Sequence, residues 1–180
     1  MNDDFIFTSE SISRGHPDKL CDQVSDAIVD QFLRHDRHAG ITTECAISSG
    51  ILFIAARYAS VAKVDIPEVA RRVIRDVGYP NEVFNADNCS IMTSFVDRTR
   101  REYEPLDLDN LGDEAIDRIT AKHPITAFGY ACNQTPNLMP LPVWLAHRLA
   151  DALDAKKVRK KLPYLLPDGK SQVSVEYVNG

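Results

Sequence analysis

The chain lacks any long hydrophobic run and any recognisable leader segment. No window of its 180 residues approaches the apolar length of a membrane span, which is about eighteen residues. The first residues, MNDDFIFTSES, are acidic where a signal peptide needs basic side chains, and no apolar run follows them. The composition is otherwise that of a soluble globular protein, with 44% apolar and 26% charged residues. We therefore expect a cytoplasmic protein with no membrane partner.

Cysteine is scarce, and its spacing gives no sign of a metal or disulfide framework. The four cysteines are widely separated, without a CxxC pair and without histidines at metal-ligand spacing. This pattern favours reduced, mostly buried thiols over a structural metal or a disulfide. The four are Cys21, Cys45, Cys89 and Cys132.

An excess of positive charge is also missing. The formal net charge is -5, whereas binding to the phosphate backbone of a nucleic acid needs a surplus of clustered lysine and arginine. We expect no nucleic-acid partner. One local basic cluster, KKVRKK at 156–161, is more typical of a solvated helix end.

The hydrophobic pattern of residues 1–97 predicts one complete domain of the α/β (α+β) class. Apolar positions at helical spacing indicate an amphipathic helix over 19–34, and two β-rich runs that meet near Gly50 indicate an antiparallel hairpin. This order predicts a mixed sheet with helices packed on one face. The expected elements are a strand at 5–9, a helix at 19–34, strands at 42–50 and 51–60, a helix at 66–77 and a strand at 89–96.

The remaining residues predict a connecting segment and an incomplete second domain. Residues 98–123 are charged and aperiodic, with one short helix expected at 113–120. Residues 124–180 are expected to hold one helix and two strands, the last at 171–178, and too little apolar surface for a domain that stands alone. The expected helix has a leucine seam of Leu138, Leu141, Leu145, Leu149 and Leu153.

The stretch GHPDK, residues 15–19, is a candidate phosphate and metal site. A glycine followed by a helix start places backbone amides, the imidazole of His16 and the ammonium of Lys19 near one point, which suits phosphate oxygens. Asp18 could hold a divalent ion that bridges those oxygens. The residues alone leave a second interpretation open, in which Asp18 only caps the helix and His16 is a surface residue.

Two further positions are candidates of the same kind. In the turn PDGK, residues 167–170, Lys170 could supply charge for a phosphate and Asp168 an acceptor for a ribose or adenine edge. A Pro-Asp-Gly turn also forms without any function. Glu44 lies in an otherwise apolar strand, where a carboxylate needs a cation or an outward-facing position.

Three motifs in order resemble those of the S-adenosylmethionine synthetases, also called methionine adenosyltransferases. The first, FTSESISRGHPDKLCDQVSDAIVDQFL, is similar to the amino-terminal signature of that family. The others are FGYACNQTPNLMPLPVWLAHRLADAL and LLPDGKSQVSVEY. The resemblance covers nearly all of the chain, which it identifies with the amino-terminal domain and part of the middle domain of the family.

The resemblance implies a reaction in which methionine sulfur attacks the ribose carbon of ATP that bears the triphosphate, after which the triphosphate is hydrolysed. By motif match, His16 would contact the departing triphosphate, Asp18 would bind magnesium, and Asp168 and Lys170 would hold ATP. Glu44 would take the potassium-site position. The implied substrates are ATP and methionine, and the implied assembly is a dimer in which two sheets face each other.

The chain departs from the family pattern at three positions assigned to methionine. Arg57, in the stretch AARYA, stands where the family has a glutamate, Arg98 where it has a glutamine and His123 where it has an aspartate. Replacing a carboxylate by a guanidinium reverses the local charge. Three hypotheses follow: a divergent synthetase, a non-catalytic or half-site partner of a full-length synthetase in a homodimer or heteromer, or an adenosyl transferase with another, anionic acceptor.

Overall fold

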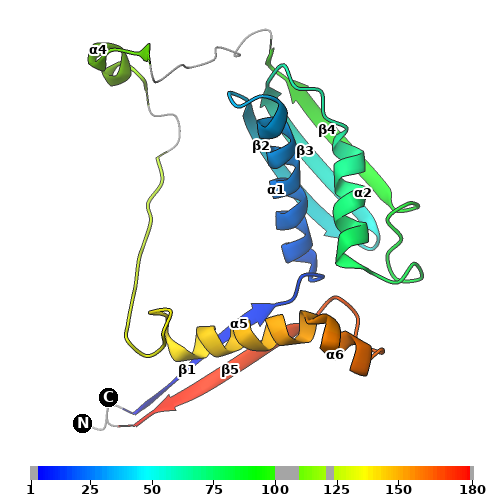
Figure 1. Cartoon of the computed structure of the whole chain (residues 1–180), viewed down its shortest axis with the longest axis vertical. Helices are drawn as coiled ribbons and strands as arrows, with labels where there is room; N and C mark the ends of the chain where they lie inside the picture. The colour runs from blue at the N-terminus through cyan, green and yellow to red at the C-terminus, as the bar shows by residue number, and fades with distance from the viewer. Residues whose placement is uncertain (1–3, 100–109, 121–123, 179–180) are drawn as a thin grey trace.

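The computed structural model describes residues 4–99, 110–120 and 124–178, and these residues form two unequal units (Figure 1). The larger unit contains α1 (Pro17–His35), β2 (Gly40–Ser48), β3 (Ile51–Ala59), α2 (Ile66–Val77) and β4 (Ser90–Asp97). The smaller unit contains β1 (Phe5–Ile12), α5 (Leu141–Asp154), α6 (Lys156–Lys161) and β5 (Lys170–Tyr177). Along the sequence, α4 (Asp113–Asp117) lies between β4 and α5.

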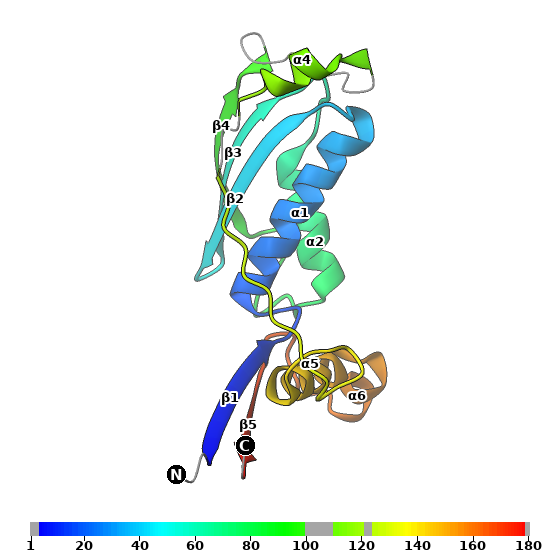
Figure 2. The same ribbon diagram turned by 90° about the vertical axis from the view of Figure 1, so that its left-hand side faces the viewer.

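The sheet of the larger unit has the order β2-β3-β4 and is mixed. Strands β2 and β3 are antiparallel, as the hairpin prediction required, while β4 runs parallel to β3. The hairpin turns at Ser49 and Gly50, whose φ values of 48° and 80° match the left-handed turns that suit a two-residue loop. Figure 2 shows α1 and α2 on one side of this sheet, which confirms the predicted mixed sheet with helices on one face.

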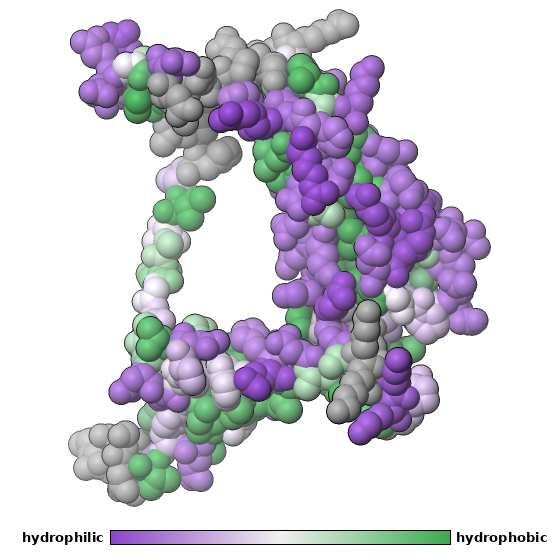
Figure 3. All heavy atoms as spheres, viewed as in Figure 1, coloured by the Kyte–Doolittle hydropathy of each residue, from purple (hydrophilic) through white to green (hydrophobic). Residues whose placement is uncertain are grey.

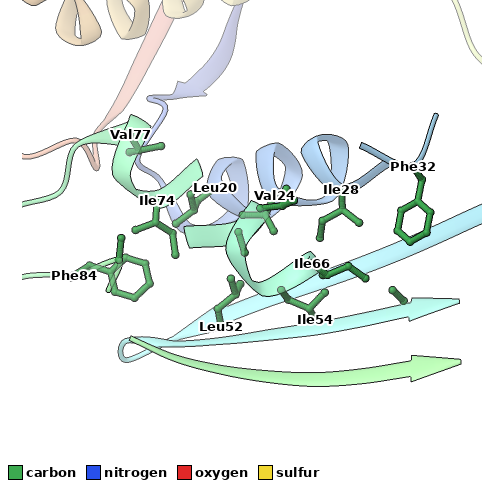
Figure 4. Close-up of a cluster of buried hydrophobic side chains, with 14 residues drawn as sticks. Leu20, Val24, Ile28, Phe32, Leu52, Ile54, Ile66, Ile74, Val77 and Phe84 are labelled. Carbon is green, nitrogen blue, oxygen red and sulfur yellow. The ribbon is translucent and has the colours of Figure 1, made fainter. Parts of the chain in front are cut away.

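The core of the molecule lies between this sheet and its two helices (Figure 4). The buried apolar residues of α1 are four positions apart, so they form one stripe that faces the sheet. Alternate residues of β3 point toward this stripe. The outward faces of the helices carry hydrophilic residues (Figure 3). The largest buried side chains here are Leu20, Val24, Ile28 and Phe32 of α1, Leu52 and Ile54 of β3, and Ile74 of α2.

Helix α2 has the boundaries that its sequence predicts. The Asp65 carboxylate accepts from the backbone N–H of Glu68 at 3.0 Å, which caps the first turn. Gly78 ends the helix with φ 82°, a left-handed conformation that suits glycine.

The first strand does not belong to the larger sheet, although the sequence pattern suggested that it did. Strand β1 pairs antiparallel with β5, with Phe5 opposite Tyr177 and Ile12 opposite Lys170. The pairing joins the two ends of the chain, a long-range contact that local periodicity does not encode. The domain boundaries predicted at residues 97 and 123 stay predictions. Strand β1 belongs to the smaller unit, whereas α1, the next element along the chain, belongs to the larger one.

Helix α5 packs on the β1–β5 pair with small residues at its fully buried positions, while the predicted leucine seam is only partly buried. Its buried residues are Pro142, Ala146 and Ala150, while Leu149 is 51% exposed. The small side chains let the helix backbone approach the strands, so that the Ser171 hydroxyl donates to the Ala146 carbonyl at 2.7 Å. Leu138 precedes the helix and has φ 58°.

Two further features concern the cysteines and the helices of the described residues. All four cysteines are free thiols, each half-buried. No helix in the described ranges combines the length and the apolar character needed to cross a membrane.

Candidate functional site

The two polar turns predicted from the sequence meet at the junction of the two units. The backbone N–H of Ser13 donates to the Gly169 carbonyl at 2.9 Å, and that of Gly15 donates to the Pro167 carbonyl at 3.1 Å. The Ser13 hydroxyl also donates to the Pro167 carbonyl, at 2.6 Å, from a buried position. These bonds bring the start of GHPDK and the PDGK turn into direct contact.

The approach of the two turns depends on the absence of a side chain at residue 15. A Cβ atom built on Gly15 would lie 2.4 Å from the Pro167 Cβ and 2.6 Å from the Pro167 carbonyl oxygen. No real side chain fits at such distances, and φ of Gly15 is not in the left-handed region. Glycine is therefore required here by close packing, not by backbone conformation.

His16 and Asp18 begin helix α1 beside this contact. His16 is the N-cap residue, and its Nδ1 atom accepts from the backbone N–H of Asp18 at 3.3 Å. The Asp18 carboxylate lies 3.9 Å from the same Nδ1 atom, and its side chain is 86% exposed. The capping interpretation is thus partly correct, except that the imidazole of His16, not Asp18, makes the cap.

Lys170 follows the PDGK turn and is held by a carboxylate that sequence reasoning did not identify. Its Nζ atom lies 2.7 Å from Glu10 Oε2 on the neighbouring strand β1, and both side chains are about half exposed. The pair forms diagonally across the β1–β5 ladder, where Glu10 faces Gln172. An exposed pair of this kind contributes only about 0.2–1 kcal/mol.

A cavity of about 220 Å³ opens beside the joined turns. Its walls come from both turns and from apolar residues of the larger unit, so the cavity lies at the junction. The lining includes Gly15, Pro17, Asp168, Ile47, Tyr79, Phe84 and Leu166. The side chains of His16, Asp18 and Lys170 are not part of this lining, so the structure joins the two turns without gathering their charged groups in one cavity.

Tyr79 stands out in the cavity wall because its hydroxyl donates to the Gly15 carbonyl. Burial, followed by the negative charge of nearby Asp168, raises the pKa of Tyr79 to about 12. The phenol therefore stays protonated, and able to donate, throughout the neutral range. Burial likewise raises the pKa of the neighbouring Cys21 thiol to about 11, so this cysteine is a poor nucleophile.

Glu44 and Arg57 share a separate hollow of about 160 Å³ on the open face of the larger sheet. Glu44 pairs with Ala55 in the ladder, and Arg57 is the next residue of β3 on the same face. A potassium ion held at Glu44 and the Arg57 guanidinium would both be positive, and two such charges about 7 Å apart repel by about 2 kcal/mol at an effective dielectric of about 20. The donor set therefore does not fit a potassium ion at Glu44, because the guanidinium would repel it.

Of the other two altered positions, only one lies within the described residues. Arg98 follows β4, and its backbone N–H donates to the Tyr58 carbonyl at 2.7 Å. Arg57 pairs with Val96 in the ladder, so both arginines lie at the same end of neighbouring strands. His123 lies outside the described residues.

Magnesium fits Asp18 only as one ligand of a larger set. No cluster of three or more histidine, cysteine, aspartate or glutamate side chains in the described ranges could hold a metal ion. Magnesium, however, commonly binds one or two carboxylates and completes its shell with substrate phosphates and water. The exposed Asp18 carboxylate suits that mode of binding.

Sequence reasoning did not single out three residues of this junction. Ser13, Glu10 and Tyr79 act through partners that are distant along the chain, so spacing within a motif could not reveal them. Ser13 and Glu10 lie within the first family motif, so the polar residues of that motif were a signal for these two. Nothing in the sequence around Tyr79 points to the Gly15 carbonyl.

The fold and the joined turns define an α+β protein whose candidate site is built where two units share their polar turns. Family models match two stretches of the chain. Residues 4–99 match the S-adenosylmethionine synthetase N-terminal domain, and residues 118–180 match the S-adenosylmethionine synthetase central domain.

The chain belongs to the S-adenosylmethionine synthetase family. It is 41% identical over 181 residues to S-adenosylmethionine synthase of Prochlorococcus marinus (strain AS9601), covering 98% of this chain and 44% of that protein. It is 39% identical over 187 residues to S-adenosylmethionine synthase of Trichodesmium erythraeum (strain IMS101), covering 100% of this chain and 44% of that protein. The chain therefore spans less than half the length of these relatives.

Replacing Gly15 by alanine tests whether the junction depends on the close approach of the two turns. The new methyl group collides with Pro167, so we expect Gly15→Ala to lower the free energy of unfolding by about 1–3 kcal/mol. Gly112→Ala is the matched control, because nothing lies within 4 Å of a Cβ there. Urea unfolding followed by circular dichroism measures both, and equal stability of the two variants would contradict the prediction.

Proposed function

We propose that the chain binds ATP and magnesium at the joined turns and transfers the adenosyl group of ATP to the sulfur of methionine. The observation that carries this proposal is the direct contact between GHPDK and PDGK through Gly15 and Pro167. Family membership supports the reaction type. We also propose that the protein is cytoplasmic.

The reaction forms one bond and breaks one bond in its first step. A lone pair of the methionine sulfur attacks C5′ of the ribose, and the C5′–O bond breaks with its electrons passing to the triphosphate. Water then cleaves the triphosphate to phosphate and diphosphate. The physical demand is stabilisation of a highly charged leaving group, so cations near it contribute most.

His16 and Lys170 are the proposed catalytic residues. In this proposal the imidazole of His16 contacts the departing triphosphate, while Lys170 exchanges its exposed partner Glu10 for phosphate oxygens, and Asp168 accepts from the adenosine part of ATP. Asp18 holds magnesium, which supplies positive charge to the phosphates. Potassium at Glu44 was implied by resemblance, and the guanidinium of Arg57 in the same hollow argues against it.

Two alternatives are weighed against this proposal. Arg57 and Arg98, at one end of neighbouring strands, favour an anionic acceptor in place of methionine. The other alternative is a non-catalytic or half-site subunit that pairs with a full-length synthetase.

Product formation separates these functions. The chain is incubated with ATP, magnesium, potassium and methionine, alone and mixed with a full-length synthetase, and S-adenosylmethionine is quantified. Product from the chain alone would support the proposed reaction. Product only in the mixture, above the rate of the full-length enzyme, would support the partner function. ATP binding by the chain alone, with no product of its own and no increase over the full-length enzyme in the mixture, would favour another acceptor. No ATP binding at all would contradict a nucleotide site.

The variant Asp18→Asn tests the magnesium assignment. Loss of the carboxylate should weaken ATP binding about tenfold in the presence of magnesium, which corresponds to about 1.4 kcal/mol, and should have little effect when magnesium is removed. Asp26→Asn removes the same charge farther along α1 and serves as the control. Isothermal titration calorimetry with and without magnesium measures both, and equal affinity of the two variants would rule the assignment out.

We also propose that the open face of the β2-β3-β4 sheet binds a second copy of the chain or a related synthetase subunit. Phe53, Met92 and Val96 are 42%, 53% and 46% exposed on or beside this face. Glu44 and Arg57 on the same face have opposite charges. In a two-fold arrangement Arg57 of one copy can therefore approach Glu44 of the other.

Gel filtration with light scattering at micromolar concentration should show a dimer. Phe53→Asp places a charge in the proposed apolar contact and should shift the protein to monomer, because burying an unpaired carboxylate is costly. Val61→Asp is the control, since Val61 is 65% exposed and lies outside the sheet. A monomer in the unmodified chain would refute the dimer.

A further inference from the structure

We propose that Tyr79 is a positioning residue that fixes the orientation of His16 through its hydrogen bond to the Gly15 carbonyl. Its role in the reaction rests on the proposed function, whereas its effect on the His16 turn does not. Tyr79 lies outside the GHPDK and PDGK motifs and reaches their junction from the end of α2.

The position of the phenol is set by two features of the larger unit. Gly78 ends α2 in a left-handed conformation, so the chain turns sharply and residue 79 leaves the helix. The Tyr79 ring then packs against Phe84 with centroids 5.5 Å apart and an interplanar angle of 88°, an edge-to-face contact. The ring is anchored, and its hydroxyl is carried to the buried Gly15.

The hydrogen bond from Tyr79 to the Gly15 carbonyl also constrains His16, because the two residues share one peptide group. The Gly15 carbonyl and the His16 N–H belong to one planar unit that rotates as a whole. Tyr79 holds the carbonyl end, and the Ser13 carbonyl accepts from the His16 N–H at 3.1 Å. Since both ends are held, the peptide plane has one orientation, and this orientation directs the Cα–Cβ bond of His16.

The adjoining groups of the turn are held in the same way. The Gly15 N–H donates to the Pro167 carbonyl at 3.1 Å, and the Arg14 carbonyl accepts from Gln23 Nε2 at 2.8 Å. Tyr79 ties the α2 end of the larger unit to the carbonyl end of this peptide. Without it, the Gly15–His16 peptide is held at its N–H end only.

Orientation of His16 is important for a group that must meet a departing phosphate. Misplacement of a reacting group by about 1 Å can reduce a rate about a hundredfold. Tyr79 does not touch the phosphates in this account. It acts through His16, and the protonated state of its phenol keeps the donor present across the neutral range.

Tyr79→Phe tests the inference, because it removes the hydroxyl and keeps the ring. In the nuclear magnetic resonance spectrum of the chain, the imidazole signals of His16 should shift, while those of His35 and His147 should not. Amide exchange at His16 should quicken about tenfold, as expected for loss of one hydrogen bond. Tyr164→Phe, in a residue 74% exposed, should change neither quantity.

A second variant separates the hydrogen bond from the packing. Phe84→Leu loosens the ring contact but keeps the Tyr79 hydroxyl, so the His16 signals and exchange rate should change clearly less than in Tyr79→Phe. If Phe84→Leu alters His16 as strongly as Tyr79→Phe, the effect comes from packing and the inference is overturned. Unchanged His16 signals in Tyr79→Phe would also overturn it.

Binding of magnesium and ATP connects this inference to the proposed function. Tyr79→Phe should weaken ATP affinity about five- to tenfold, in proportion to one lost hydrogen bond, with melting temperature close to that of Tyr164→Phe. If the unmodified chain binds no ATP, the proposed function fails, yet the His16 measurements still decide the role of Tyr79. If the chain binds ATP and Tyr79→Phe leaves both His16 and the affinity unchanged, only the inference fails.

Discussion

The contact between Gly15 and Pro167 is the constraint on which the rest of the structure depends. Two backbone hydrogen bonds and one serine hydroxyl join residues 13–15 to residues 167–169, and the space where a Cβ would lie is filled by Pro167. The residues that follow β1 are thus joined to the residues that precede β5. Both units are positioned by this contact, because β1 enters it from one side and α1 leaves it on the other.

This arrangement explains why the polar turns lie where they do. Strand β1 pairs with β5 along its whole length, so the residues that follow β1 and those that precede β5 are necessarily neighbours. The Arg14 N–H donates to Asp154 at 2.8 Å, which adds the end of α5 to the same junction. A site between the units is a consequence of strand pairing, and the cavity beside it takes its apolar wall from the larger unit.

Local features of the sequence predicted local structure well. The spacing of apolar residues in α1 and α2, the cap at Asp65 and the left-handed turns at Gly50 and Gly78 all follow from interactions within a few residues. Three facts could not be predicted in this way. The pairing of β1 with β5, the small-residue packing of α5 and the bond from Tyr79 to Gly15 each depend on segments far apart in the chain.

The candidate site could be predicted only in part, again because some of its contacts join segments that are far apart in the chain. Its motifs were visible because their residues are adjacent, and family resemblance indicated that they act together. Their joining appears only in the structure, as does the ion pair of Lys170 with Glu10. The hollow that Arg57 shares with Glu44 likewise depends on the register of β2 and β3.

Backbone and side chains are held with very different strength at this junction, and the difference suits the binding of a charged ligand. The turns are fixed by buried hydrogen bonds and by a contact that tolerates no side chain at Gly15. The charged groups are exposed: the Asp18 side chain is 86% exposed, and Lys170 is paired only with a half-exposed glutamate. Exposed pairs contribute about 0.2–1 kcal/mol, so a polyanion can displace Glu10 at small cost. A site built in this way keeps its geometry while its charges remain available to exchange partners.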